Sequence, residues 1–451
     1  MKSKSFSLII RNKIKNYSNT IIPDSDKSIS IRSFIFGCIA LNISRVKNVL
    51  ESEDVFATIK CLKRLNFKIL KINKGDYKIF GKGLGSAFCK NNITLNFENS
   101  GTAARLISGL ISTTPNLKVK LKGDNSLSKR NMSTLINLLS RFGATFYPRN
   151  KSFFPLTLVS SSIPIGINYK AGVSAQLKSA CLIAGLNSYG KTLILETHAS
   201  RDHSEKIVAK NRKVIKIKKD KNGLSKIEIL GKKNLFAINH RVPGDPSNSA
   251  FFTALTLLKK NSKLKIKNVC LNPRRIGFYR LLKRSGAKIK FKNKKILNNE
   301  LVGDIHVLSS NLKPLVSKSK EFSTMVDEFP ILFVIASLIP GTSIFNGIGD
   351  LVNKESNRIL EMKKILKKIN VNCEYRFNQL KVKGLKKINS KNKKIIVPNL
   401  NDHRICMSTA ILSLLTGINS EIRNFETVRT SSPSFLKIIK FLGAKYEIKK
   451  K

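Results

Sequence analysis

The feature that most limits the fold of this chain is a helix-like segment that recurs six times along its 451 residues. Each copy opens with polar residues that can cap a helix and continues with small or apolar residues on nearly all sides. A helix of that kind must be buried. The copies begin roughly 70 to 80 residues apart, which indicates a repeated structural unit. They start at Asp26, Asn99, Ser174, Asp245, Asp327 and Asp402.

A second and more amphipathic helix follows in most of the units. Examples are residues 126–144, 272–287, 354–370 and 432–444, and several of them end in Gly-Ala or Asn at the expected C-cap. Short β-type runs such as LKVKLKG, TLILE and KIIVP lie between the helices. The implied unit is a β-α-β-α-β-β module, and its repetition predicts an α/β (α+β) protein.

Six modules divide naturally into two similar domains of three modules each. We predict one domain over residues 24–241 and a discontinuous one made of residues 1–23 and 242–451. The stretch HRVPGDP at residues 240–246 has the Pro and Gly that suit a crossing between domains. The β-type run before Pro23 must pair with something, and we expect it to pair with the second domain. The connection would then be a double-crossover hinge.

The net charge of +57 is extreme and has two interpretations. It could indicate a protein that binds nucleic acid or another polyanion. It could also reflect a Lys- and Asn-rich genome, because the charge is spread along the chain and no basic stretch is interleaved with aromatics. We favour the second interpretation and expect no specific nucleic-acid partner. The charge would still attract a small anionic substrate.

Seven scattered cysteines, none at C-x-x-C spacing, argue against a disulfide framework and against a zinc site. They fit a reducing cytoplasm. No apolar run reaches the roughly 18 residues of a membrane span, and the first residues do not form a signal peptide. We therefore expect a cytoplasmic protein that does not enter a membrane.

The starts of the buried helices are the candidate sites of chemistry. A helix N-terminus offers free N–H groups and a positive dipole end, and both attract phosphate and carboxylate groups. A basic residue near one such start is usually solvated. Its recurrence around otherwise apolar helices favours anion binding, since an unpaired buried cation is costly. The basic residues in question are Lys27, Arg32, Arg105, Lys178 and Arg404.

Ten motifs in this sequence occur in the order found in one family. They are DKSISIR at 26–32, NSGTAARL at 99–106, GDNSLSKR at 123–130, SAQLKSA at 174–180, RDHSEK at 201–206, VPGDPS at 242–247, DEFPIL at 327–332, NKESNR at 353–358, DHRI at 402–405 and SPSF at 432–435. On these motifs the chain resembles the EPSP synthases, or 3-phosphoshikimate 1-carboxyvinyltransferases. The residues of its SAQ and DEFP motifs are similar to those of the bacterial class II branch. The resemblance implies two domains of three modules that close over the substrates, with helix N-termini facing the cleft.

The resemblance also implies an activity and residue roles. The enzyme would join phosphoenolpyruvate to the 5-hydroxyl of shikimate 3-phosphate and release phosphate, as a monomer and without a metal or organic cofactor. Shikimate 3-phosphate would contact Lys27, Ser28, Arg32, Ser174, Ala175, Gln176, Arg201, Asp327 and Lys354. Phosphoenolpyruvate would contact Lys27, Gly101, Arg130, Gln176, Arg358 and Arg404. The catalytic residues would be Asp327, Lys27 and Glu355.

These roles agree with the charges of the substrates. Two phosphates and two carboxylates require several cations, and Arg makes bidentate contacts with such groups. Nearby cations should keep Asp327 ionised, so that it can accept the proton of the 5-hydroxyl. Glu355 leaves two readings open. It could donate the proton to C3 of the enol, although Lys354 and Arg358 should lower its pKa, or it could only orient neighbouring cations.

Four positions depart from the motifs of the family. Asp24 and Ser25 replace the Pro and Gly of PGDKS, Ile31 replaces a His, and Asn357 replaces the Asp of KESDR. Tolerant enzymes of the class II branch tend to carry Ala where this chain has Gly101, so we expect inhibition by glyphosate.

The nearest alternative is a UDP-N-acetylglucosamine enolpyruvyl transferase, which shares the fold. That family usually has a reactive Cys between its second and third modules. The corresponding stretch here, residues 99–130, has no Cys. Cys89 precedes it, and we expect a buried thiol there.

Overall fold

The computed structural model describes residues 5–89, 93–386, 388–389 and 393–450. It divides into two compact units: unit 1 contains Met1–Asp24, Gly244–Lys295 and Leu301–Lys451, and unit 2 contains Ser25–Pro243 and Ile296–Glu300. The predicted boundaries lie one and two residues away from these and did not include residues 296–300. That each unit folds as an independent domain remains a proposal.

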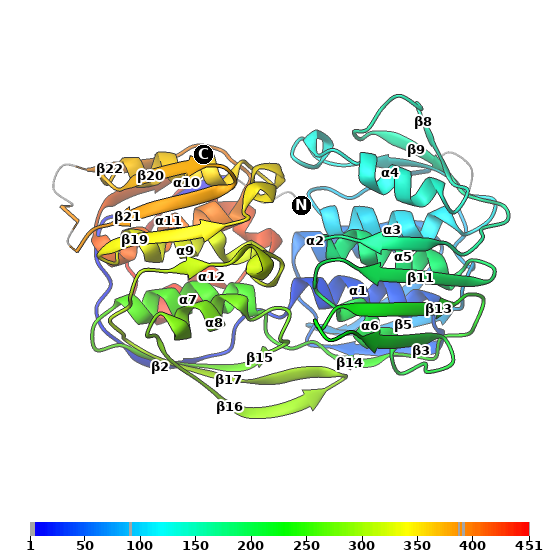
Figure 1. Cartoon of the computed structure of the whole chain (residues 1–451), viewed down its shortest axis with the longest axis horizontal. Helices are drawn as coiled ribbons and strands as arrows, with labels where there is room; N and C mark the ends of the chain where they lie inside the picture. Colours follow the sequence, from blue (N-terminus) through cyan, green and yellow to red (C-terminus); the bar gives the residue numbers. More distant parts are fainter. Residues whose placement is uncertain (1–4, 90–92, 387, 390–392, 451) are drawn as a thin grey trace. The chain divides into compact units, whose positions relative to one another are not determined.

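Unit 2 contains three modules, each built on one four-stranded sheet (Figure 1). The first has α1 (Lys27–Ile39), β3 (Leu41–Lys47), α2 (Glu53–Arg64), β4 (Lys68–Asn73), β5 (Asp76–Lys82) and, as its first strand, β14 (Asn239–Arg241). The second has β6 (Ile93–Asn96), α3 (Gly101–Ser112), β7 (Lys118–Lys122), η1 (Leu127–Lys129), α4 (Ser133–Ser140), β8 (Thr145–Tyr147) and β9 (Leu156–Val159). The third has β10 (Asn168–Ala171), α5 (Ala175–Leu186), β11 (Lys191–Glu196), α6 (His203–Val208), β12 (Ile215–Lys219) and β13 (Ser225–Leu230).

Unit 1 repeats the same plan with strands from the start of the chain. Its first module has β2 (Ser18–Ile21), α7 (Pro246–Leu258), β15 (Lys263–Cys270), α8 (Gly277–Arg284), β16 (Lys288–Leu297) and β17 (Glu300–Leu308). The next has β18 (Val316–Ser317), η2 (Ser319–Thr324), η3 (Val326–Glu328), α9 (Phe329–Ser337), β19 (Gly341–Asn346), η4 (Gly349–Asn353), α10 (Arg358–Lys367), β20 (Asn372–Arg376) and β21 (Gln379–Gly384). The last has β22 (Lys394–Val397), α11 (His403–Thr416), β23 (Asn419–Ile422), η5 (Phe425–Thr430), α12 (Phe435–Phe441), β24 (Glu447–Lys450) and β1 (Phe6–Ile10).

All six sheets have the same strand order. In the second module the order is β6-β7-β9-β8, with one parallel pair followed by two antiparallel pairs. The strands before Pro23 complete two sheets of unit 1, since β1 lies between β23 and β24 and β2 pairs in parallel with β15. The predicted β-α-β-α-β-β module and the predicted partner of the first strands are therefore both found in the structure.

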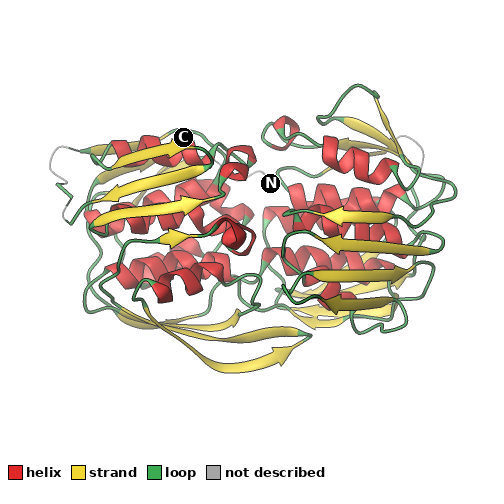
Figure 2. Ribbon diagram, in the orientation of Figure 1, coloured by secondary structure: helices red, strands yellow, loops and turns green. Residues whose placement is uncertain are grey.

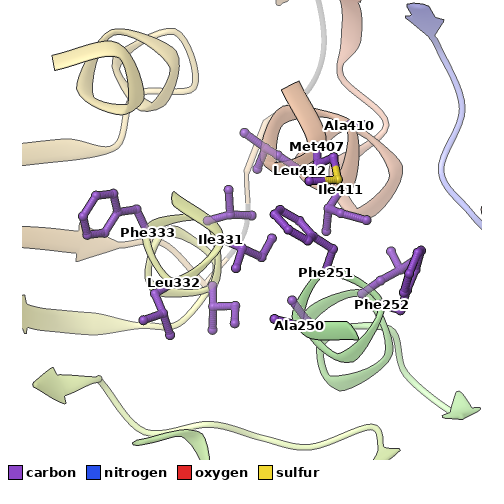
Figure 3. Close-up of a cluster of buried hydrophobic side chains, with 14 of the residues drawn as sticks. Ala250, Phe251, Phe252, Ile331, Leu332, Phe333, Met407, Ala410, Ile411 and Leu412 are labelled. Carbon is purple, nitrogen blue, oxygen red and sulfur yellow. The ribbon is translucent and has the colours of Figure 1, made fainter. Parts of the chain in front are cut away.

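The first helix of each module is buried, as its composition predicts, and the sheets flank these helices (Figure 2). In unit 1, α7, α9 and α11 pack together through Phe251, Ile331 and Met407 and their neighbours (Figure 3). Phe251, Ile331 and Met407 are fully enclosed, so the helices have no solvent-facing side in this region. Such helices can present only their N-termini to a ligand.

The polar residue before each buried helix acts as the expected N-cap in five of the six modules. For α1, the carboxylate of Asp26 accepts a hydrogen bond from the Ile29 amide at 2.8 Å. Ser100, Ser174, Asp245 and Asp402 cap α3, α5, α7 and α11 in the same way. The exception is α9, which follows the 3-10 turn η3 and has Pro330 near its start.

The abundance of Asn has a local structural role in this chain. Among the described residues, sixteen residues other than glycine have a positive φ, and thirteen of these are Asn. Asn tolerates the left-handed region better than other residues with a side chain. Thirteen of the 42 Asn residues therefore occupy positions whose backbone would otherwise favour glycine.

The expectation for the cysteines can be compared with the structure. None of the seven is part of a disulfide, and Cys406 is buried. The expectation of a buried thiol at Cys89 is wrong, because this residue is only half-buried.

Candidate active-site residues in the two units

In unit 2, the predicted site residues cluster where α1, α3, α5 and α6 pack against one another (Figure 1). Lys27 and Ser28 begin α1, Gly101 begins α3 and Ala175 begins α5. The caps hold these N-termini in place, and each N-terminus presents amide groups to the same region. The arrangement provides several anion-binding positions on neighbouring helices.

Arg32 ties α1 to α5 and α6. Its Nε donates to Ser204 Oγ at 2.9 Å, and its Nη2 donates to Ser179 Oγ at 3.0 Å. Its Nη1 donates to the carbonyl of Ser28 at 3.1 Å. Arg32 is 2 % exposed, so these contacts hold its guanidinium rigidly. The Nζ of Lys27 lies 2.8 Å from Asp54 of α2.

Gly101 lies against two guanidinium groups. A Cβ at this position would be 2.8 Å from Arg105 Nη1 and 2.9 Å from Arg130 Nη1. Arg105 Nη1 donates to Gln176 Oε1 at 2.9 Å, and the amide of Gln176 donates to Thr102 at 2.9 Å. The structure thus brings Gly101, Arg130 and Gln176 together, as the sequence predicts.

The half-buried Arg130 follows the 3-10 turn η1 and is held by neutral groups. Its Nη2 donates to the side chains of Asn99 and Ser126. Within the described residues, no carboxylate lies within 4 Å of its guanidinium. Its charge therefore remains available to an anion.

Ser174 and Arg201 flank the same group of helices. Ser174 accepts from the Leu177 amide at 3.3 Å and so caps α5. Arg201 lies two residues before α6 and is half-buried. The segment that carries it is anchored by Lys178, which is fully buried between Glu196 and Glu205, with its Nζ 2.6 Å from each. Lys178 is thus an internal ion-pair centre, and its charge is compensated within the protein.

In unit 1, Arg358 is surrounded by three carboxylates. It starts α10, and its Nε lies 2.9 Å from Asp402, while its Nη1 lies 3.6 Å from Asp327. It also pairs with Glu355. The side chain of Arg358 is 1 % exposed, whereas those of Asp327 and Glu355 are 25 % and 20 % exposed. Asp327 and Glu355 are therefore partly exposed, whereas the guanidinium of Arg358 is enclosed.

The ionisation of this cluster follows from its geometry. Burial alone would lower the pKa of Arg358, but Asp402, Glu355 and Asp327 together raise that pKa above its ordinary value. The guanidinium in turn stabilises the charged form of Glu355. This contact supports the reading in which Glu355 orients a cation.

Arg404 and Lys354 occupy different surroundings. Arg404 begins α11, where Asp402 accepts from its backbone amide at 2.9 Å. Its guanidinium lies 3.4 Å from Asn248 Oδ1 and 5.8 Å from the ring centre of Phe251. Lys354 pairs with Asp350 on η4. Arg404 is 3 % exposed, so a ligand could reach its guanidinium only if neighbouring side chains moved.

Sequence reasoning missed several residues of these clusters. Arg105 was noted only as a basic residue near a helix start, yet it contacts both Gly101 and Gln176. Its place in the NSGTAARL motif was the available signal. Asp54, Asn99 and Asn248 lie outside the motifs or carry no charge, and no sequence signal identified them as partners.

The departures from the family motifs keep the local structure. Asn357 accepts from the Leu360 amide at 3.0 Å and therefore caps α10, as Asp would. Ile31 is fully buried in α1. Ser25 is 7 % exposed and immediately precedes the N-cap Asp26, whose amide donates to the carbonyl of Pro243 at 2.8 Å.

In the part of the chain that the structure describes, no group of His, Cys, Asp and Glu could hold a metal ion. None of the described helices combines the length and apolar character needed to cross a bilayer. A cavity of about 160 Å³ in unit 2 is lined by Lys206, Lys210, Phe236, His240, Asn298 and their neighbours, and includes none of the predicted site residues.

Comparisons with known proteins agree with the motifs and the fold. The family EPSP synthase (3-phosphoshikimate 1-carboxyvinyltransferase) matches residues 11–439. A 3-phosphoshikimate 1-carboxyvinyltransferase from Zymomonas mobilis is 35% identical over 98% of this chain and 97% of its own length. One from Petrotoga mobilis is 37% identical over 94% of this chain and 96% of its own length.

A solved structure gives the same result. EPSP synthase from Acinetobacter baumannii superposes with a TM-score of 0.84 at 30% identity, over 99% of this chain and 100% of that one. An enolpyruvyl transferase from Streptomyces tendae shares the fold, with a TM-score of 0.73 at 12% identity. The UDP-N-acetylglucosamine and nucleic-acid alternatives are not favoured. The chain belongs to the EPSP synthase (3-phosphoshikimate 1-carboxyvinyltransferase) family of transferases.

Proposed function

We propose that this chain transfers the carboxyvinyl group of phosphoenolpyruvate to the 5-hydroxyl of shikimate 3-phosphate, releasing phosphate in the biosynthesis of chorismate and the aromatic amino acids. The observation that carries the proposal is the contrast between the two units. Cations gather at helix N-termini in unit 2, and the open carboxylate of Asp327 lies beside Arg358 in unit 1. The reaction needs cations that bind the anionic substrates and a carboxylate that accepts a proton.

Shikimate 3-phosphate would bind to unit 2 at the starts of α1 and α5. Arg32 supports this role, because its hydrogen bonds to Ser204, Ser179 and the Ser28 carbonyl fix the position of its guanidinium. Ser28, Ser174, Ala175, Gln176 and Arg201 would complete the pocket, with Lys27 reaching both substrates. From unit 1, Asp327 and Lys354 would contact the reacting end. Phosphate groups suit such N-termini and guanidinium groups.

Phosphoenolpyruvate would bind at Gly101, Gln176 and Arg130, with Lys27, Arg358 and Arg404. Gly101 supports this role, because the missing side chain lets a ligand approach two guanidinium groups at once. Arg358 would have to exchange one carboxylate partner for the ligand. Arg404 lies beside Asn248, with its Nη1 3.4 Å from the side-chain oxygen of Asn248.

In the reaction, Asp327 would accept the proton of the 5-hydroxyl as that oxygen attacks C2 of the enol. C3 gains a proton, and the product of this step is a tetrahedral adduct. Loss of phosphate from C2 and of a proton from C3 then restores the carbon–carbon double bond. Glu355 and Lys27, or another lysine, are the candidates for the donor to C3. Glu355 pairs with Arg358, and Lys27 pairs with Asp54.

The chain would act as a monomer in the cytoplasm. Burial raises the pKa of the Cys61 thiol to about 12 and that of the Cys373 thiol to about 11. Such thiols are poor nucleophiles. Light scattering of the purified protein would test the monomer. A stable dimer mass at micromolar concentration would contradict it.

A phosphate-release assay tests the proposed reaction. The wild type should release phosphate only when both substrates are present. Asp327→Ala should lower the rate by about a thousandfold, because it removes the proton acceptor. Release from phosphoenolpyruvate alone, or a full rate in the variant, would contradict the proposal.

A further inference from the structure

The carboxylate of Glu300 contacts a helix 97 residues away in the sequence. Its Oε1 lies 2.6 Å from Nδ1 of His203, and its Oε2 lies 3.2 Å from Nζ of Lys206. Both residues of the first pair are nearly enclosed, at 2 % exposure for Glu300 and 1 % for His203. A buried pair of this kind holds its two elements in one register.

Two more hydrogen bonds join the same elements. Lys206 Nζ donates to the carbonyl of Asn299 at 2.9 Å, and Asn299 Nδ2 donates to the carbonyl of Lys206 at 3.0 Å. The turn at residues 296–300 belongs to unit 2, although most of strands β16 and β17 belong to unit 1. The turn is therefore fastened to α6 by both side-chain and main-chain groups.

The helix α6 needs such support. It has only six residues, and Asp202 makes no side-chain cap hydrogen bond at its start. Helices of this length are marginal without tertiary contacts. On its other side α6 is held through Glu205, whose carboxylate lies 2.6 Å from Lys178.

The helix carries groups that bear on ligand binding. Ser204 accepts from Arg32 and donates to Ser179 at 2.8 Å, and so fixes the guanidinium of Arg32. Arg201 lies two residues before the helix. A shift of α6 would therefore move Arg201 directly and Arg32 through Ser204.

We propose that Glu300 is a positioning residue for shikimate 3-phosphate, acting through His203 and Lys206 on the segment Arg201–Ser204. The inference rests on the proposed function, since it takes Arg32 and Arg201 as ligands of that substrate. Glu300 itself touches no substrate. It fixes the place of α6, which follows Arg201 and contacts Arg32 through Ser204.

Steady-state kinetics of the full chain test this role. Glu300→Ala should raise KM for shikimate 3-phosphate about tenfold, the usual effect of losing a buried charged hydrogen bond. KM for phosphoenolpyruvate should change less than about twofold. Glu300→Gln should restore most of the loss, because its amide oxygen can still accept from His203. Lys206→Ala removes the contacts of Nζ with Glu300 and with the Asn299 carbonyl but leaves the pair of Glu300 with His203. It should raise KM for shikimate 3-phosphate about threefold.

Asp304→Asn is the matched control. Asp304 lies on the same strand, is 6 % exposed and accepts from the Asn268 amide at 3.0 Å and the Asn293 side chain at 2.8 Å. The substitution should disturb the hairpin of β16 and β17 without changing the contacts of α6. An equal rise in KM in this control, or an unchanged KM in both Glu300→Ala and Lys206→Ala, would overturn the proposal.

Hydrogen exchange separates this inference from the proposed reaction. The amides of His203–Val208 should exchange about tenfold faster in Glu300→Ala than in the wild type or in Asp304→Asn. Unchanged exchange would overturn the role of Glu300, whatever the activity. A wild type without phosphate release would overturn the proposed function, and faster exchange would still support the anchoring of α6.

Discussion

Arg130 of unit 2 and Arg358 of unit 1 are both assigned to phosphoenolpyruvate by resemblance, yet their surroundings differ. Arg130 is half-buried and donates to Asn99 and Ser126. Arg358 is fully enclosed and paired with Asp327, Glu355 and Asp402. An arginine held by neutral groups keeps its attraction for an anion, whereas one surrounded by carboxylates is already compensated.

The difference indicates a division of labour between the units. On the proposed function, Arg32 and Arg130 of unit 2 would bind substrate, and Asp327 of unit 1, beside the buried Arg358, would accept the proton. Substitution of Arg32 or Arg130 should therefore change affinity, and substitution of Asp327 should change turnover.

Asp327→Asn should lower kcat by about a thousandfold, because the amide cannot accept the hydroxyl proton. The side chain keeps its size, so KM for shikimate 3-phosphate should change less than about threefold. Glu361→Gln is the control, since Glu361 lies on the helix α10 and pairs with the exposed Lys364 at 2.8 Å. If Asp327→Asn kept its kcat but lost affinity for shikimate 3-phosphate, the result would contradict the assignment of Asp327 to proton transfer.

Arg130→Ala should raise KM for phosphoenolpyruvate by about 30- to 100-fold, the expected loss for a charge-assisted contact. Its kcat at saturation should fall much less. Arg141→Ala is the matched control, because Arg141 is an exposed arginine of the same module that donates to the Asn168 carbonyl at 2.6 Å. Equal effects in the two variants would show that general charge, and not this position, attracts the substrate.

His240 of unit 2 should make that unit sensitive to acid. Burial is the main cause that lowers the pKa of His240 to about 4, with Glu300 opposing the shift and Lys210 contributing to it. The unfolded chain binds a proton near pH 6.5 and the folded unit does not, so stability falls as the pH drops from about 6.5 towards 4. The loss should be about 2 kcal/mol at pH 5.

Urea unfolding of the wild type and His240→Asn at pH 7 and pH 5 measures this effect. The variant should lose about 2 kcal/mol less on acidification than the wild type. Parallel pH dependence in the two proteins would contradict the assignment. In unit 1, burial also lowers the pKa of His306, with Lys265 and Lys292 adding to the effect, but that side chain is partly exposed and should contribute less.

Gly101→Ala should raise KM for phosphoenolpyruvate about tenfold. The added methyl group would lie 2.8 Å from Arg105 and 2.9 Å from Arg130, so these groups must shift. The wild type should be inhibited by glyphosate, and the variant should need at least tenfold more for half inhibition. Full wild-type activity in excess glyphosate would contradict the expectation.

Asn357→Ala should cost only about 1 kcal/mol of stability, because it removes the N-cap of α10. Asn357→Asp should restore that stability, since a carboxylate caps a helix equally well. Urea unfolding compares the three proteins. A large loss of activity in Asn357→Asp would show that this departure from the family motif matters for catalysis.

Much of the fold could be predicted because the six buried helices leave a strong local signal. An apolar circumference after a cap residue specifies a buried helix wherever it occurs, and the spacing of Asp26, Asn99 and Ser174 shows the repeat. Pairing of the first strands with unit 1 followed from the need to complete a sheet. The turn at residues 296–300 could not be assigned, because its place depends on contacts with α6.

The site could be predicted residue by residue but not as a network. The motifs identify Arg32, Arg358 and Asp327. No sequence pattern indicates that Ser204 contacts Arg32, or that three carboxylates surround Arg358. Such contacts join modules far apart in sequence, and their distances depend on how the helices pack. The role of Glu300 could not be foreseen for the same reason.

Calorimetric titration with shikimate 3-phosphate tests the division of labour most directly, because it measures affinity without turnover. Wild type, Arg32→Ala and Asp327→Asn should be compared under one set of conditions. We predict that Arg32→Ala weakens binding by about 100-fold and that Asp327→Asn stays within about threefold of the wild type. The reverse order, with Asp327→Asn the weaker binder, would contradict the account.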